Sequence, residues 1–353
     1  MKRHPNWTLI LVPAATLALT FFRVPLASSQ GLTLVAPYVE PDLPIDDPDS
    51  PLWSQSTALE IPLSAQTATR PMILETTVRA VSARALHDGS RIALLVEWSD
   101  ATKSETTVLA EDFRDAVAVQ FPLAEGPPFF CMGQVGSNVN IWHWKADWEA
   151  ERTARADVDS VYPNMYVDQY PFTSADEPVS ASPADYTDPN YLPAMATGNL
   201  QAASTRASSV EDLVAGGFGT LTAEPLAGQN VDGFGLWSGG TWRVIFSRDL
   251  RSTETDDVRF TAGRLYSMAF AAWDGANGER NGEKSTSQWV SLQLAPAPGA
   301  AVPPGGAPPE QSAQRGWLNE GFYWVAGPVI ATLLLIPLLV GGLLLVFRIY
   351  EEK

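Results

Sequence analysis

Two segments of the chain carry side chains that could act as ligands to a metal centre. The first, residues 129–148, holds Met132 in an aromatic and glycine context, with Trp142, Trp144 and Trp148 close behind. A methionine thioether is a soft axial ligand, although a lone methionine usually packs in a core. Tryptophans at this density either fill a core or line a flat, apolar ligand. The segment therefore predicts either a core or a ligand pocket.

The second segment, residues 270–289, contains Lys284 in a turn ahead of a Trp289-containing strand. Lysine is scarce, and only Lys103, Lys145 and Lys284 lie between residues 30 and 321. An amine binds a metal only after it loses its proton, which requires burial or the metal itself. A lysine in a turn is ordinarily a solvated charge, so the spacing alone leaves both interpretations open.

The sequence contains no other catalytic motif, and its many Asp and Glu residues leave a carboxylate pair open without singling one out. After residue 29 the histidines are His87, which lies in a turn signal, and His143. No nucleophile elbow, phosphate-binding loop, dinucleotide fingerprint or H-E-x-x-H motif occurs. Cys131 is the single cysteine, which excludes an intrachain disulfide, a thiolate zinc or iron–sulfur cage and a C-x-x-C-H attachment motif.

Several motifs occur in an order that resembles the haem-binding gamma subunits of ethylbenzene dehydrogenase and its relatives. They are residues 115–122 (DAVAVQFP), 132–133 (MG), 140–146 (NIWHWKA), 162–168 (YPNMYVD), 239–248 (GGTWRVIFSR) and 272–275 (AWDG), followed by Lys284 and Trp289. The resemblance covers about residues 59–294. Related subunits serve dimethylsulfide dehydrogenase, selenate and chlorate reductases, and nitrate-reducing or nitrite-oxidising enzymes.

The resemblance implies an immunoglobulin-like β-sandwich that holds one haem b without covalent links. In this family type the iron lies between a methionine and a lysine, which correspond to Met132 and Lys284. Lys145 and His143 are the alternatives for the second ligand. The expected haem pocket residues are Phe130, Asn140, Trp142, Trp144 and Trp273.

An iron with two axial ligands has no open site, so the resemblance implies a non-catalytic electron relay. Its expected partners are a molybdopterin catalytic subunit and an iron–sulfur subunit, with a soluble cytochrome c or a membrane quinone enzyme as the further donor or acceptor. Two other functions stay open. Trp142, Trp144 and Trp148 could stack on sugars in a carbohydrate-binding module, or the domain could be a haem-free tether.

The elements that must position these residues are predicted to be strands. Short runs rich in β-branched and aromatic residues, separated by Gly, Asn and Asp turns, are typical of an all-β sandwich. The predicted strands are residues 59–63, 76–86, 91–98, 116–121, 242–248, 265–273 and 288–294. Residues 149–230 are rich in Asp, Pro and Ser and predict a long loop insertion with a short helix near 209–213.

The ends predict export and anchoring. Residues 1–29 have a basic start, an apolar stretch and small residues at a cleavage site, as in a signal peptide. Residues 30–294 form the domain, and residues 295–321 a Pro/Gly/Ala-rich linker. Residues 322–347 lack charges and are long enough for a transmembrane helix, which leaves 348–353 as a cytoplasmic tail. The domain would then lie on the extracytoplasmic face.

The chain is strongly acidic, with a formal net charge of −17. This charge repels nucleic acid, and it would steer a basic partner such as a small soluble cytochrome.

Overall fold

The computed structural model describes residues 32–40, 42–124, 126–128, 132–153, 155–164, 199–202 and 206–299. The predicted signal peptide, transmembrane segment and cytoplasmic tail lie outside these ranges, as does the linker beyond residue 299. Within the described ranges, no helix combines the length and the apolar character needed to cross a membrane.

The described residues are mostly strands. The strands are β1 (Thr33–Ala36), β2 (Leu59–Ala65), β3 (Ala80–His87), β4 (Arg91–Ser99), β5 (Ala116–Pro122), β6 (Val139–Lys145), β7 (Val210–Ala215), β8 (Thr222–Ala223), β9 (Asp232–Ser238), β10 (Thr241–Asp249), β11 (Leu265–Trp273), β12 (Ser285–Ser287) and β13 (Val290–Leu294). Helices are short: α2 (Ala146–Ala150), α3 (Val158–Val161), and the 3₁₀ turns η1 (Pro51–Gln55), η2 (Leu200–Ala202), η3 (Leu226–Gly228) and η4 (Gly275–Asn277).

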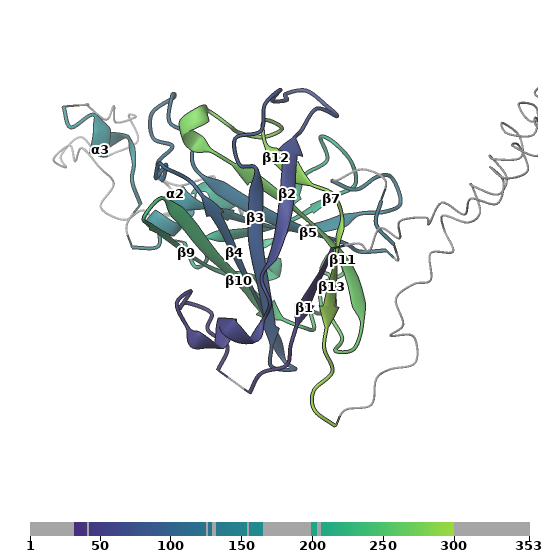
Figure 1. Ribbon diagram of the computed structural model, residues 1–353. Coiled ribbons are helices and arrows are strands. Elements are labelled where there is room, and N and C mark those ends of the chain that lie inside the picture. Colours follow the sequence, from purple (N-terminus) through teal and green to yellow (C-terminus); the bar gives the residue numbers. More distant parts are fainter. Residues whose placement is uncertain are drawn as a thin grey trace, which may run out of the picture.

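The strands follow one hydrogen-bonded path in the order β8-β7-β6-β5-β11-β12-β2-β3-β4-β10-β9, and β13 joins β11 to β1. Pairing is antiparallel except between β1 and β13. The two halves of this path form the two layers visible in Figure 1, with β2, β3, β4 and β10 on one side and β5 and β7 on the other. The all-β sandwich predicted from the sequence is confirmed at this level.

The core fills the space between the layers. Trp144 of β6 meets Trp242 of β10 with ring centroids 4.9 Å apart, and Trp98 of β4 at 6.2 Å. On β9, Gly235 lies directly against the Trp144 ring, so a side chain there would clash with the indole. Aromatic pairs of this kind add to the area they bury, and they fix which face of β6 points inward.

The seven predicted strands correspond to β2, β3, β4, β5, β10, β11 and β13, with shifted ends. The helix predicted near residues 209–213 is wrong, because Val210–Ala215 form β7 and pair with β6. The polar residues Glu211 and Asp212 of this strand are buried and bonded by partners on β6. The long insertion therefore ends earlier than predicted.

Candidate functional site

A cavity of about 880 Å³ lies against the outer face of the β7-β6-β5-β11 layer. Strand alternation sends one set of side chains into the sandwich core and the other set to this face. The cavity-facing set is small or apolar: Ala116, Ala118, Ile141, Leu213, Ala271 and Trp273. Alanines at three of these positions leave room that larger side chains would fill. Cofactor pockets are typically about 300–1,000 Å³ and mostly apolar.

Met132 lies on the cavity wall in an unusual backbone conformation. Its φ is 79°, in the left-handed region that few residues other than glycine adopt. The backbone N–H of Met132 donates to Gln120 Oε1 (3.1 Å), and its carbonyl accepts from the N–H of Gly217 (2.8 Å). The next residue, Gly133, also has a positive φ, and a Cβ there would lie 2.6 Å from the Ala215 carbonyl. These contacts hold a strained residue in place, which is common at functional sites.

Lys284 reaches the same cavity from the turn before β12. Its backbone carbonyl accepts from the N–H of Gln66 (2.9 Å). The Gln66 side-chain amide donates to the Gly282 carbonyl (2.8 Å), and the Trp273 indole donates to the Asn281 carbonyl (3.1 Å). This loop is therefore fastened to the sheet on both sides of Lys284, and only 8% of the Lys284 surface is exposed.

The side chains of Met132 and Lys284 meet across the cavity. Lys284 Nζ donates to Met132 Sδ at 3.6 Å, and it lies 5.0 Å from the centre of the Trp273 ring. The fold thus brings together a thioether and an amine that are 152 residues apart in the chain, inside a pocket with apolar walls.

His143 also lines the cavity. Its ring stacks on Trp273 with centroids 4.7 Å apart, and within the described residues its Nε2 has no hydrogen-bond partner. Burial lowers the pKa of His143 well below 6.5, and the charges of Lys145, Arg114 and Lys284 lower it further. His143 is therefore a neutral ring on the wall at physiological pH.

Lys145 is not among the residues that line the cavity. Its Nζ forms a buried ion pair with Glu211 and lies 4.0 Å above the Trp148 ring. Burial lowers the pKa of Lys145 to about 8, whereas the Glu211 charge opposes this shift. Its amine is held by a carboxylate and does not face Met132.

The remaining residues expected in the pocket divide between two faces. Trp273 lines the cavity. Asn140, Trp142 and Trp144 alternate with the cavity-facing residues of β6 and are fully buried on its inner face. Asn140, Trp142 and Trp144 were expected in the haem pocket, but they do not line the cavity. Phe130 lies outside the described residues.

The family follows from the sequence comparisons. The family model described as ethylbenzene dehydrogenase matches residues 50–285, well over half of the chain. The chain belongs to the ethylbenzene dehydrogenase family. The resemblance predicted from the motifs is thereby confirmed.

Relatives of this family member carry names of oxidoreductase subunits. It is 24% identical over 264 residues to the haem subunit assigned to a respiratory nitrate reductase of Haloferax mediterranei, covering 74% of this chain and 73% of that one. It is 24% identical over 252 residues to the chlorate reductase gamma subunit of Ideonella dechloratans (70% and 79% covered). The dimethylsulfide dehydrogenase gamma subunit of Rhodovulum sulfidophilum is 23% identical over 271 residues (72% and 78% covered).

A solved structure that superposes on this family member is a carbohydrate-binding protein from Bacteroides uniformis described as crystallised at 2.70 Å. The TM-score is 0.37 at 9% identity, over 75% of this chain and 99% of that one. A superposition this loose carries no argument about function.

Sequence reasoning missed the residues that hold this family member's Met132 and Lys284 in place. Gln120 and Gln66 bond the two loops, and Ala118 opens the pocket. A signal for the pocket was present, because the alternation of residues 116–120 (AVAVQ) places small and polar residues on one face. Nothing in the spacing identified Gln66.

Proposed function

We propose that this chain is an electron-transfer subunit that holds one non-covalent haem b between Met132 and Lys284. It would relay electrons between a molybdenum and iron–sulfur oxidoreductase and a cytochrome or quinone-linked partner. The observation that carries the proposal is the approach of Met132 Sδ to Lys284 Nζ, at 3.6 Å, inside an apolar cavity of about 880 Å³.

The residues present fit a haem b. Thioether and amine are both able to ligate iron, and Met132 and Lys284 both line the cavity. Alanines on β5 and β11 leave a flat floor, and the His143 and Trp273 rings supply aromatic surface. Arg70, Arg114 and Arg280 also line the cavity, and guanidinium groups suit the carboxylates of a porphyrin.

The chain's own residues would set how the group behaves. When bound, haem b supplies one-electron chemistry. The Met132 thioether favours a raised potential. The amine of Lys284 must be deprotonated to act as a ligand. The Gln120 and Gln66 hydrogen bonds would hold both ligands in position.

The partners follow from the names of the relatives. Gamma and haem subunits of nitrate and chlorate reductases support association with a catalytic molybdenum subunit and an iron–sulfur subunit. Anchoring by residues 322–347 and an extracytoplasmic location remain part of the proposal, as does the immunoglobulin-like description of the sandwich.

The carbohydrate-binding alternative has lost its basis. It required exposed Trp142, Trp144 and Trp148, but all three are buried. The haem-free tether is distinguished by experiment, because it requires that changes at Met132 and Lys284 leave the function intact.

The test is the absorption spectrum of the purified full-length chain in its oxidised and reduced forms. We expect about one low-spin haem b per chain. Met132→Ala and Lys284→Ala should each lose haem or convert it to a high-spin form, whereas Lys103→Ala should not, since Lys103 is exposed and pairs with Glu105. A wild-type protein that shows no low-spin haem spectrum, even after haem titration, would refute the proposal.

A further inference from the structure

A second polar site lies on the inner side of β7, separate from the cavity. Asp212 of β7, Glu224 after β8 and Asp257 in the β10–β11 loop each offer a carboxylate oxygen, and these oxygens lie within 4.8 Å of one another. All three residues are buried. The three carboxylates come from separate parts of the chain, so the fold itself assembles the group.

The local positive charge does not balance this group. Arg248 of β10 is also buried, and its Nη1 donates to Asp257 Oδ1 at 2.7 Å. One guanidinium against three carboxylates leaves two negative charges without compensation. Burying unpaired charge is costly, so two protons or one divalent cation must neutralise the cluster.

The hydrogen bonds of the cluster show which carboxylate oxygens lack a donor. Asp257 is satisfied by Arg248, Asn230 and Ser252. Asp212 is fully buried, and its Oδ1 accepts from Asn140 Nδ2 (2.6 Å). Within the described part of the chain, Asp212 Oδ2 has no partner.

One further oxygen shares this condition, and the Glu224 carboxylate is weakly bonded. Glu224 is only 5% exposed, and its Oε1 accepts a long 3.5 Å contact from the Asn140 amide. Asn230 donates its Nδ2 to Asp257, while its buried Oδ1 finds no donor among the described residues. Buried acceptors of this kind are rare in native proteins and ask for an unseen water, proton or ion.

The electrostatics of the cluster agree with this picture. Burial raises the pKa of Asp212 to about 8, with the charges of Glu224 and Asp257 contributing. Burial also raises the pKa of Glu224 to about 7, with Asp257 and Asp256 contributing. Without a cation, the buried carboxyl groups of Asp212 and Glu224 ionise less readily than exposed ones. A cation at the centre would offset the cost of ionising them.

We propose that Asp212, Glu224 and Asp257, with the Asn230 side-chain carbonyl, form a calcium site that fastens β7 to the loops beside it. The four donors are all oxygens, which a hard cation prefers over the nitrogen and sulfur ligands that select zinc or copper. The three carboxylate oxygens lie within 4.8 Å of one another, and an all-protein set of oxygens suits Ca²⁺ better than Mg²⁺, which usually keeps several of its waters. One Ca²⁺ and Arg248 would balance the three carboxylates.

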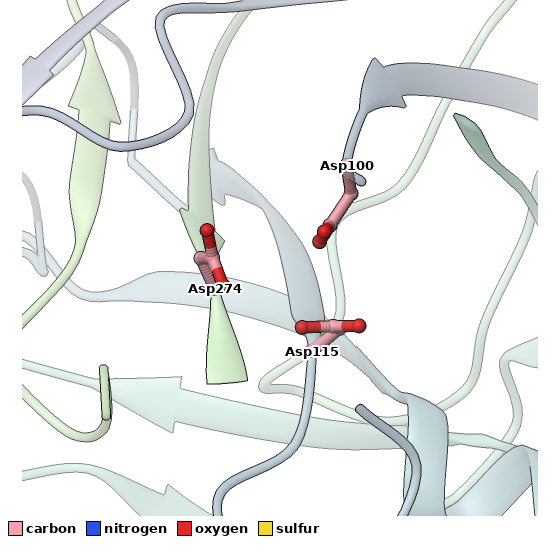
Figure 2. A group of neighbouring side chains, drawn as sticks. All are labelled: Asp100, Asp115 and Asp274. Atoms are coloured by element: carbon pink, nitrogen blue, oxygen red, sulfur yellow. The ribbon is translucent and has the colours of Figure 1, made fainter. Parts of the chain in front are cut away.

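The second acidic group of the protein provides a matched comparison. Figure 2 shows Asp100, Asp115 and Asp274, which gather where β4 and β11 end and β5 begins. There, Asp115 accepts from the backbone N–H groups of Ser104 and Gly275 and from the Trp242 indole.

The other two members of that group also have donors. Asp100 Oδ1 accepts from Thr102, and Asp274 accepts from Asn277. Asp100 Oδ2 has no partner among the described residues, but both carboxylate oxygens of Asp115 accept hydrogen bonds. N–H and hydroxyl donors thus already serve this group, and Asp274 is only half-buried. We make no proposal for this group of three aspartates, which serves as the control for the Asp212 group.

The test is a thermal melt of the chelator-treated full-length chain with added CaCl₂. At about 100 times the dissociation constant we expect Tm to rise by about 5–10 °C. Asp212→Asn should abolish this rise while leaving the calcium-free protein as stable as wild type or more so, because the amide removes a charge. Asp274→Asn should keep the wild-type response. Glu224→Gln repeats the test should Asp212→Asn fail to fold.

Terbium emission gives a second readout. Trp142 Nε1 donates to Asn140 Oδ1, and Asn140 in turn donates to Asp212, so this indole lies close enough to sensitise a bound Tb³⁺. We expect emission that Ca²⁺ competes away and that Asp212→Asn lacks. A Tm that Ca²⁺ leaves unchanged at millimolar concentration, or a rise that persists in Asp212→Asn, would overturn the proposal. A larger response to MgCl₂ than to CaCl₂ would overturn the choice of metal.

Discussion

The side-chain carbonyl of Gln120 accepts a hydrogen bond from the backbone N–H of Met132 at 3.1 Å. Gln120 sits on β5, one strand away from the residues that follow Met132 into β6. The bond ties the strained Met132 backbone to the rigid sheet, so Gln120 acts as a positioning residue for the proposed thioether ligand.

Replacing Gln120 should therefore weaken the cofactor site. Gln120→Leu removes the acceptor and leaves a buried N–H unpaired, a loss of about 1–3 kcal/mol. We expect haem affinity to fall by about tenfold, measured by haem titration of the apoprotein, with a changed low-spin spectrum. Gln120→Glu keeps an oxygen acceptor, so it should keep the wild-type haem affinity and the wild-type low-spin spectrum. The exposed Gln134→Ala should behave as wild type, and an unaltered spectrum in Gln120→Leu would contradict the role.

Gly133 is predicted to tolerate no side chain. Gly133→Ala places a Cβ 2.6 Å from the Ala215 carbonyl in addition to the strain of a positive φ. Gly136 has a similar φ of 80° but open space around it, so Gly136→Ala should cost about 1–2 kcal/mol. Gly133→Ala should lower the free energy of unfolding by about 1–3 kcal/mol more than Gly136→Ala, because of the clash. Urea unfolding of both variants measures the difference, and equal costs would refute the close approach.

Lys145 is predicted to be structural. Lys145→Met leaves Glu211 buried without its partner and should lower the free energy of unfolding by about 3–5 kcal/mol. The low-spin spectrum of the folded protein should persist, because the amine does not face the cavity. Adding Glu211→Gln should recover part of the lost stability. Loss of the low-spin spectrum in Lys145→Met, with the fold retained, would instead make Lys145 the second ligand.

Asp115 should give the protein a measurable pH dependence. Burial raises the pKa of Asp115 from 3.8 to about 6, the Ser104 and Gly275 N–H groups and the Trp242 indole oppose this rise, and the Asp100 charge adds to it. The folded state then binds a proton more tightly than the unfolded chain. The stabilisation is fully present below pH 3.8 and is lost as pH rises through about 6.

The matching variant is Asp115→Asn, which cannot titrate. Two pKa units correspond to at most about 3 kcal/mol, so between pH 4 and pH 7 wild type should lose up to that much stability relative to Asp115→Asn. Urea unfolding at a series of pH values gives the difference, with Asp274→Asn as the control from the same group. Parallel curves for wild type and Asp115→Asn would contradict the raised pKa.

The sequence predicted the strands well where β-branched and aromatic runs are bounded by turns, as in β4 and β10. It did not show which face of a fully buried strand meets the cavity. Every residue of β6 except His143 is buried, so alternation could not tell which face meets the other layer, and Trp142 and Trp144 were expected in the wrong place relative to the cavity. The segment of β7 was predicted as a short helix, because the partners that bury Glu211 and Asp212 in a strand, Lys145 and Asn140, lie far away in the sequence.

The candidate ligands were predictable for a different reason. Met132 and Lys284 came from a resemblance in motif order, and spacing alone did not distinguish them from packing or solvated residues. Their proximity depends on β5, β11 and β12 being neighbours in the sheet, a non-local pairing that no local pattern encodes. Gln66 and Gln120 were missed for the same reason.

A potentiometric titration of the full-length chain, followed by its haem spectrum, tests the central claim most directly. The proposal predicts a single one-electron wave. In Met132→His an imidazole replaces the thioether, so the haem should stay low-spin while its potential becomes more negative. Absence of a one-electron wave, or a potential that Met132→His leaves unmoved, would contradict the proposal that Met132 ligates an electron-relaying haem.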